Sequence, residues 1–166
     1  GHYLKNNTKP KKGLKTARML GHITYLSEEH MDLRFGRKFQ DNESKITRDV
    51  DFEIENYLQY KGEKFSDAFD ANTYILMTKA MDNFDPSSNM DGDLKKALIN
   101  IKSKLLVIGF KTDWLFPPKK GKEIQLAAME AGIKSSFVVL DGKHGHDSFL
   151  FMSDRYFKII RSFIES

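Results

Sequence analysis

The sequence feature that most constrains the fold is an alternation of short apolar runs and a helical segment within residues 104–150. Residues 105–110 and 136–140 are apolar runs, short enough to be buried strands. Between them, residues 118–131 begin with proline, continue with strong helix formers and stop before a glycine, which predicts a helix. A strand–helix–strand crossover of this kind makes the two strands parallel and the connection right-handed.

The loops that follow these two runs carry the candidate chemistry. Asp113 comes after the first run, and His146 lies in the string GKHGHD after the second. Ligands of open parallel sheets bind beyond the carboxyl ends of the strands, so Asp113 and His146 are expected to face one crevice. A carboxylate can hold a histidine in the tautomer that acts as a base, and can stabilise its protonated form. The alternative is a pair of polar loops without chemistry, which every parallel sheet has.

The first half of the chain predicts several short helices and no convincing strand. Residues 14–25 and 71–84 have apolar side chains near helical spacing, and residues 52–60 form a shorter candidate that Gly62 would end. Ser27 can cap a further helix with acidic residues in its first turn. We therefore divide the chain into an exposed lead-in (1–13), a helical cap or lid (14–100) and a βαβα part of the core (101–166).

Composition excludes several classes of protein. The chain has 166 residues, of which 40% are hydrophobic and 30% charged, as in an ordinary globular domain with a sizeable core. It has no cysteine, which excludes a thiol nucleophile, a disulfide framework and a cysteine-based zinc site. No apolar run approaches the roughly 20 residues of a membrane-spanning helix, and no secretory signal is visible. We therefore expect a cytoplasmic protein without membrane contact.

Nucleic-acid binding and metal binding are both disfavoured. The net charge of +4 comes largely from a basic arm at the N-terminus, but this arm lacks the interleaved aromatic side chains typical of a nucleic-acid-binding surface. We interpret it as a solvated arm. The cluster of His144, His146 and Asp147 contains metal-ligand types, but a metal needs three or four converging ligands, and the other histidines lack a matching spacing. No metal site is expected.

Four separated strings resemble one protein family. The strings ARMLGHITYLSEE, FDANTYILMTKAMDNFD, TDWLFPP and GHDSFL occur in the order found in the homoserine O-acetyltransferase family, and the resemblance runs from about Gly13 to the C-terminus. Members of that family are α/β-hydrolase-fold acyltransferases. The resemblance implies an α/β fold class, namely the C-terminal part of an α/β-hydrolase fold, in which a helical cap is followed by a βαβα unit.

The resemblance also implies roles for individual residues. Asp113 and His146 match the acid and the base of the family's catalytic triad. Arg18 and Tyr25 match positions that bind the substrate carboxylate, and Asp147 matches the contact to the substrate amino group. An arginine fork and a tyrosine hydroxyl suit a carboxylate, and an acidic side chain suits an ammonium group. Without the resemblance, the alternatives are a surface arginine, a core tyrosine and an aspartate that caps the final helix.

The activity that the resemblance implies is that of a homoserine O-acetyltransferase of methionine biosynthesis. Acetyl would pass from acetyl-CoA to a serine and then to homoserine, by ping-pong transfer. Acetyl-CoA is then a co-substrate, and no cofactor is bound tightly. The family's cap helices form a homodimer, which would use the apolar helix face that includes Met77 and Met81.

The chain lacks one part of this machinery. None of its serines lies in a Gly-x-Ser-x-Gly elbow, so the nucleophile and the oxyanion hole are expected in the family's first half, in cis or in trans. The chain alone is therefore expected to be inactive. Alternatives on the same scaffold are a homoserine succinyltransferase and a serine acyltransferase. An alternative of another class is a non-catalytic interaction module or a split subunit.

Overall fold

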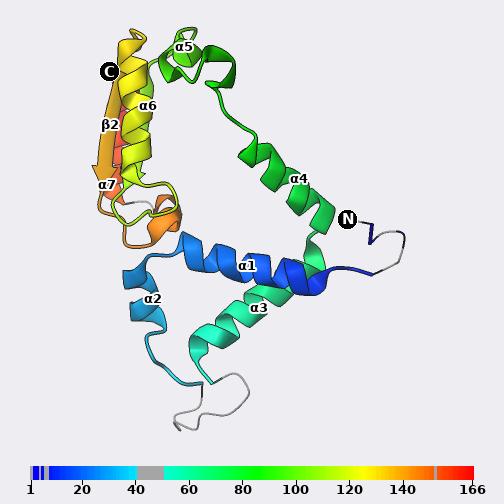
Figure 1. Ribbon diagram of the computed structural model, residues 1–166. Helices are drawn as coiled ribbons and strands as arrows, with labels where there is room; N and C mark the ends of the chain where they lie inside the picture. The colour runs from blue at the N-terminus through cyan, green and yellow to red at the C-terminus, as the bar shows by residue number, and fades with distance from the viewer. Residues whose placement is uncertain (1, 4, 6–7, 41–50, 152) are drawn as a thin grey trace. The chain divides into compact units, whose positions relative to one another are not determined.

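The computed structural model describes residues 2–3, 5, 8–40, 51–151 and 153–166. The chain divides into two compact units, and Figure 1 labels helices α1 to α7 and strand β2. The first, which we call the helical unit, comprises Gly1–Thr24 and Met31–Phe84. The second, the sheet unit, comprises Tyr25–His30 and Asp85–Ser166.

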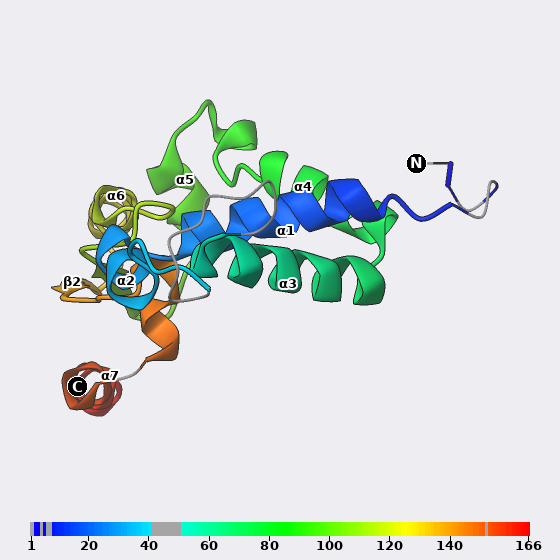
Figure 2. The ribbon, with the colours of Figure 1, turned by 90° about the horizontal axis from the view of Figure 1, so that it is seen from below.

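The helical unit is built from α1 (Lys11–Tyr25), α2 (Glu28–Arg34), α3 (Glu53–Ala68) and α4 (Ala71–Asp82), although the end of α1 and the start of α2 belong to the sheet unit. Helices α1 and α3 are antiparallel neighbours (Figure 2). The Lys15 ammonium pairs with the Glu63 carboxylate at 2.7 Å, and the Tyr57 hydroxyl lies 3.1 Å from Nδ1 of His22. Polar contacts at both ends of the contact region therefore fix the alignment of the two helices.

Gly62 accounts for the close approach of α1 and α3. A Cβ atom at this position would lie 2.7 Å from Cγ of Lys15 and 2.9 Å from the Lys15 carbonyl oxygen. The expectation that Gly62 ends its helix is wrong, because α3 continues through it to Ala68. Glycine inside a helix costs about 0.5–1 kcal/mol relative to alanine. Here the missing side chain is what lets the two backbones meet.

The sheet unit has the strand–helix–strand crossover that the sequence predicts. Strands β1 (Leu105–Phe110) and β2 (Ser135–Leu140) are parallel, with Leu105 opposite Ser135 and Phe110 opposite Leu140. Helix α6 (Pro118–Glu130) packs on one face of the sheet, and α7 (Asp154–Glu165) lies on the other (Figure 2). This arrangement confirms the predicted βαβα order and the α/β fold class.

Short elements complete the sheet unit, namely η1 (Ser88–Met90), α5 (Leu94–Leu98) and η2 (Gly145–Leu150). Because α5 packs with α6, the sheet unit extends back to Asp85, whereas the sequence places a boundary between residues 100 and 101. Over the part of the chain that the structure describes, no helix is both long and apolar enough to cross a membrane.

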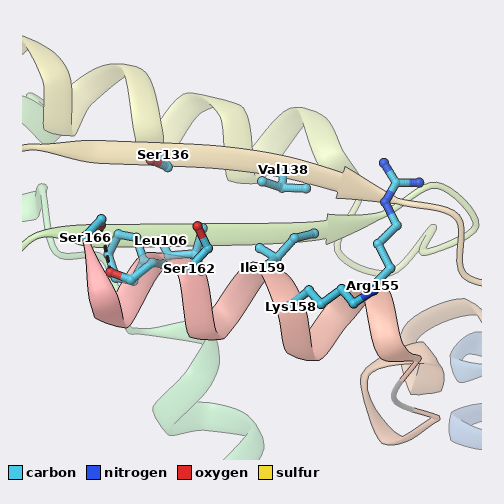
Figure 3. A pocket seen from close by; sticks show the side chains of 9 residues that line it. Leu106, Ser136, Val138, Arg155, Lys158, Ile159, Ser162 and Ser166 are labelled. Carbon is cyan, nitrogen blue, oxygen red and sulfur yellow. Dashed lines mark hydrogen bonds between the residues drawn. The ribbon is translucent and has the colours of Figure 1, made fainter.

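A groove of about 370 Å³ runs between α7 and its face of the sheet (Figure 3). Leu106 and Val138 contribute its apolar strand side, Ile159 and Phe163 line it from α7, and Arg155 stands at one end. No described residue of α7 is buried. The groove contains none of the residues from the loops that follow β1 and β2.

Replacing Gly62 by alanine tests the contact between α1 and α3, and Gly21→Ala is a matched control in α1. A Cβ atom at Gly21 meets nothing within 4 Å. Gly21→Ala should therefore raise the free energy of unfolding by about 0.5–1 kcal/mol. Gly62→Ala collides with Lys15 and should lower it by about 1–3 kcal/mol, the usual cost of overpacking. Thermal unfolding followed by circular dichroism measures both changes, and equal stabilisation by the two variants would contradict the close contact.

Candidate active site

Asp113 and His146 meet at the carboxyl ends of the two strands. The loop after β1 presents Asp113, and η2, which follows β2, presents His146. Nδ1 of His146 lies 3.0 Å from Oδ2 of Asp113, which is the hydrogen bond expected from the sequence. Because Nδ1–H donates to the carboxylate, Nε2 is the nitrogen that can exchange a proton with a reacting group.

The acid loop holds the Asp113 carboxylate in one orientation. The side chain is only 7% exposed, and its second oxygen, Oδ1, accepts hydrogen bonds from the amides of Leu115 at 3.1 Å and Phe116 at 2.8 Å. The Asp113 amide in turn donates to the carbonyl of Phe110, the last residue of β1, at 3.1 Å. A buried charge is tolerated when it is hydrogen-bonded in this way. The carboxylate is therefore anchored to the strand before it meets the histidine.

Aromatic rings surround the imidazole of His146. The ring centroids of Tyr25, Phe116 and Phe149 lie 5.3 Å, 5.0 Å and 5.7 Å from its own. The side chain is 27% exposed, so part of the ring remains accessible. A pocket of about 340 Å³ opens beside the pair and is lined on its apolar side by Phe116, Phe149 and Tyr156.

Two hydroxyl groups that sequence reasoning missed stabilise the histidine loop. The hydroxyl of Thr112 donates to the Gly142 carbonyl and accepts from the Gly145 amide at 3.1 Å, so it joins the acid loop to the histidine loop. The hydroxyl of Ser148 accepts from the His144 amide at 3.1 Å. The only sequence signal for these roles is the position of each hydroxyl, next to Asp113 or two residues after His146.

An ion pair also joins the ends of the two strands. The Lys111 ammonium lies 2.5 Å from a carboxylate oxygen of Asp141. Its hydrogen bond and its positive charge hold the pKa of the Asp141 carboxyl below the usual range. Both side chains are about two-thirds exposed, at 65% for Lys111 and 68% for Asp141. Asp141 is therefore a solvated acid close in the fold to the buried Asp113, and a substitution at Asp141 can serve as the control for the same substitution at Asp113.

The predicted substrate-binding residues fall in both units. Tyr25 and Asp147 belong to the sheet unit, where the Tyr25 ring contacts His146 and Asp147 follows it directly in η2. The alternative role of Asp147 as the cap of the final helix is excluded, because Ser153 caps α7 by accepting from the Tyr156 amide at 3.3 Å. Arg18 lies in the helical unit, where its guanidinium is 5.1 Å from the centre of the Phe65 ring.

His144 does not join His146 and Asp147 in a cluster. Its Nδ1 lies 2.7 Å from Nδ1 of His30, and its ring stacks on Phe151 with 4.0 Å between the centroids. Among the residues that the structure describes, no group of three histidine or acidic side chains could hold a metal ion.

Sequence comparison relates the chain to homoserine O-succinyltransferases. It is 48% identical over 164 residues to the homoserine O-succinyltransferase of Litchfieldella anticariensis, covering 99% of this chain and 42% of that protein. It is 43% identical over 166 residues to the one of Nitrosomonas eutropha, covering 100% of this chain and 44% of that protein. The chain thus spans less than half the length of these relatives. No family model matches it.

Solved structures share the fold. The crystal structure of the esterase E22 L374D mutant has a TM-score of 0.76 and 26% identity, covering 95% of this chain and 43% of that one. Homoserine O-acetyltransferase from Bacillus anthracis has a TM-score of 0.75 and 20% identity, covering 87% of this chain and 38% of that one. At 20% identity this second likeness concerns the fold alone. By its sequence relatives and its fold, the chain belongs to the homoserine O-acyltransferase family and forms part of an α/β-hydrolase fold.

Proposed function

We propose that the chain supplies the acid and the base of a homoserine O-succinyltransferase and works as part of a longer protein. The observation that carries the proposal is the 3.0 Å hydrogen bond between His146 and Asp113 at the ends of two parallel strands. The relatives at 43% and 48% identity, both named homoserine O-succinyltransferases, supply the substrate class. Succinyl replaces acetyl as the proposed donor group, because the Bacillus anthracis acetyltransferase supports only the fold.

In the proposed mechanism His146 moves protons in both half-reactions. Nε2 takes the proton of a serine hydroxyl as the oxygen attacks the succinyl thioester, and then gives it to the departing CoA thiolate. Nε2 next takes the proton of the homoserine hydroxyl, which attacks the acyl-enzyme. The proton returns to the serine oxygen as O-succinylhomoserine leaves. Asp113 keeps Nδ1 protonated and stabilises the imidazolium form in each step.

The serine and the oxyanion hole belong to the longer protein in this proposal. No Gly-x-Ser-x-Gly string occurs in the chain, and a serine mechanism needs nucleophile, base and oxyanion hole in one geometry. The proposed enzyme is a homodimer formed through its cap helices. Helix α4 offers an apolar surface for this contact, with Leu76 69% exposed, Met77 54% and Met81 68%.

Recognition of homoserine is assigned to three residues. Asp147 would accept a charge-assisted hydrogen bond from the ammonium group of homoserine, and Arg18 would hold its carboxylate with a two-pronged fork. Tyr25 would add a hydroxyl donor to the same carboxylate. The ring contact between Tyr25 and His146 supports this assignment, because it places one of these residues beside the base.

The complete protein should prefer a succinyl donor. With homoserine present, we expect kcat/KM for succinyl-CoA to exceed that for acetyl-CoA by roughly tenfold or more, as one paired carboxylate on the donor can provide. Release of free CoA measures both reactions, and the 166-residue chain alone should release none above the rate without protein. A preference for acetyl-CoA would restore the acetyltransferase assignment. Continuous CoA release without homoserine, beyond the single burst of acyl-enzyme formation, would instead favour a hydrolase, as the likeness to esterase E22 allows.

Replacing Asp113 by asparagine should lower kcat of the complete protein by about a thousandfold or more, because the amide favours the wrong tautomer of His146. His146→Ala should remove the base and cost at least as much. Asp141→Asn is the matched control, since it makes the same change at an exposed carboxylate after the neighbouring strand. The control should keep kcat within about twofold, as expected for a surface ion pair. Equal losses in the two Asp→Asn variants would refute a specific role for Asp113.

Removing the substrate contacts should affect homoserine more than the acyl donor. Arg18→Ala and Asp147→Ala each leave one charged end of homoserine unpaired, a loss of about 2–5 kcal/mol in transition-state binding when the contact is buried. The burst of CoA released without homoserine reports acyl-enzyme formation, and it should change much less than steady-state turnover. If both variants slowed the burst as much as the full reaction, these residues would not be homoserine contacts.

A further inference from the structure

The segment Tyr25–His30 contacts both loops that carry the acid–base pair, and all of it belongs to the sheet unit. On the acid loop, the indole nitrogen of Trp114 donates to the Leu26 carbonyl at 3.3 Å. Trp114 directly follows Asp113 in the sequence. Trp114, the neighbour of the acid, is thus hydrogen-bonded to a residue 88 positions earlier in the chain.

On the histidine loop, three polar contacts come from the same segment. The Ser27 hydroxyl donates to the Lys143 carbonyl, and the Lys143 ammonium lies 3.4 Å from the Glu29 carboxylate. Nδ1 of His30 lies 2.7 Å from Nδ1 of His144. All three contacts land two or three residues before His146, and the Ser27 hydrogen bond holds the backbone that leads into the base.

The backbones of the segment and of the histidine loop also touch directly at Gly145. This residue has a φ of 63°, which favours glycine. A Cβ atom there would lie 2.6 Å from the Tyr25 carbonyl oxygen and 2.7 Å from the Ser27 amide nitrogen. No side chain fits between the two backbones, and the next residue in the chain is His146. A small displacement of the segment would therefore displace the base.

One hydroxyl group stands at the centre of these contacts. Ser27 is 3% exposed, and its oxygen accepts a hydrogen bond from the His30 amide at 3.1 Å, which caps α2 as the sequence predicts. The same oxygen donates its single proton to the Lys143 carbonyl. The sequence predicts the first of these bonds and gives no sign of the second, whose partners are 116 positions apart.

We infer that Ser27 is a positioning residue for His146: its hydroxyl couples the start of α2 to the histidine loop and so sets the direction of Nε2. The inference rests on the proposed function, in which Nε2 must reach a serine hydroxyl. Misplacement of a catalytic group by about 1 Å can cost on the order of a hundredfold in rate. The hydrogen bond that Ser27 donates to the Lys143 carbonyl, rather than the cap that it forms on α2, is what positions the base.

The test uses two substitutions of nearly equal size. Both Ser27→Asp and Ser27→Asn keep an oxygen that can cap α2. Only asparagine keeps a donor for the Lys143 carbonyl, because an ionised aspartate can only accept. In the complete protein we expect Ser27→Asp to lower kcat by about 10- to 100-fold relative to Ser27→Asn, with KM for homoserine unchanged. Both half-reactions should slow together, since His146 serves both.

Ser153 provides the control. Its hydroxyl caps α7 by accepting from the Tyr156 amide at 3.3 Å, and it is an exposed cap in the same unit. Ser153→Asp and Ser153→Asn should have equal kcat. Equal kcat for the two Ser27 variants, near that of the unchanged protein, would overturn the inference. Equal losses accompanied by equal falls in Tm would also overturn it, because Ser27 would then be a structural cap only.

A second measurement separates this inference from the proposed activity. Amide hydrogen exchange of residues 142–147, followed by mass spectrometry, reports how firmly the histidine loop is held whether or not the protein turns over substrate. We expect exchange roughly fivefold faster in Ser27→Asp than in Ser27→Asn, as for the loss of one hydrogen bond. Faster exchange in Ser27→Asp, in a protein that uses no acyl donor, would uphold the coupling of Ser27 to the histidine loop and refute the proposed function. Identical exchange in the two variants would refute the coupling of Ser27 to the histidine loop.

Discussion

The parallel pairing of β1 and β2 is the constraint on which the candidate site depends. Because Phe110 lies opposite Leu140, both strands end at the same level, and their loops leave from one edge of the sheet. The ladder continues one step further, where the Lys111 amide donates to the Leu140 carbonyl at 3.0 Å. A slip of one residue would turn every strand side chain to the opposite face. The hydrogen bond between Asp113 and His146 is therefore a consequence of this register.

Burial and hydrogen bonding then determine how the pair can act. The Asp113 carboxylate is 7% exposed and receives two backbone amides as well as the imidazole. A carboxylate held in this way does not have to reorient when the histidine gains a proton, which is the advantage of a preorganised site. The histidine is also constrained, since rings on three sides limit the rotation of its side chain. The site therefore combines a fixed acid with a partly exposed base.

The geometry and the sequence relatives inform different parts of the function. Asp113 and His146 are the groups proposed to move protons to and from an attacking oxygen, a step that acyltransferases and esterases share. The relationship to homoserine O-succinyltransferases indicates which acceptor and donor the longer protein is proposed to use. The segment Tyr25–His30 connects proposed substrate recognition with the base. It carries Tyr25, a proposed substrate-binding residue, and it also touches the loop that holds His146.

The sequence by itself determined β1, α6 and β2 and the place of the pair, whereas the final helix, expected from about Phe149, begins at Asp154 after η2. The apolar run at 105–110 and the helix expected at 118–131 match β1 and α6 to within one residue, because strand and helix signals depend on neighbours a few positions away. Only the tertiary structure decided that Gly62 lies inside a helix against Lys15, and that the hydroxyl of Ser27 reaches the histidine loop. A glycine or a serine has the same local signal at a cap, in a turn or at a packed contact. Its partner is set by how distant segments pack, and that packing leaves no periodic trace in the sequence.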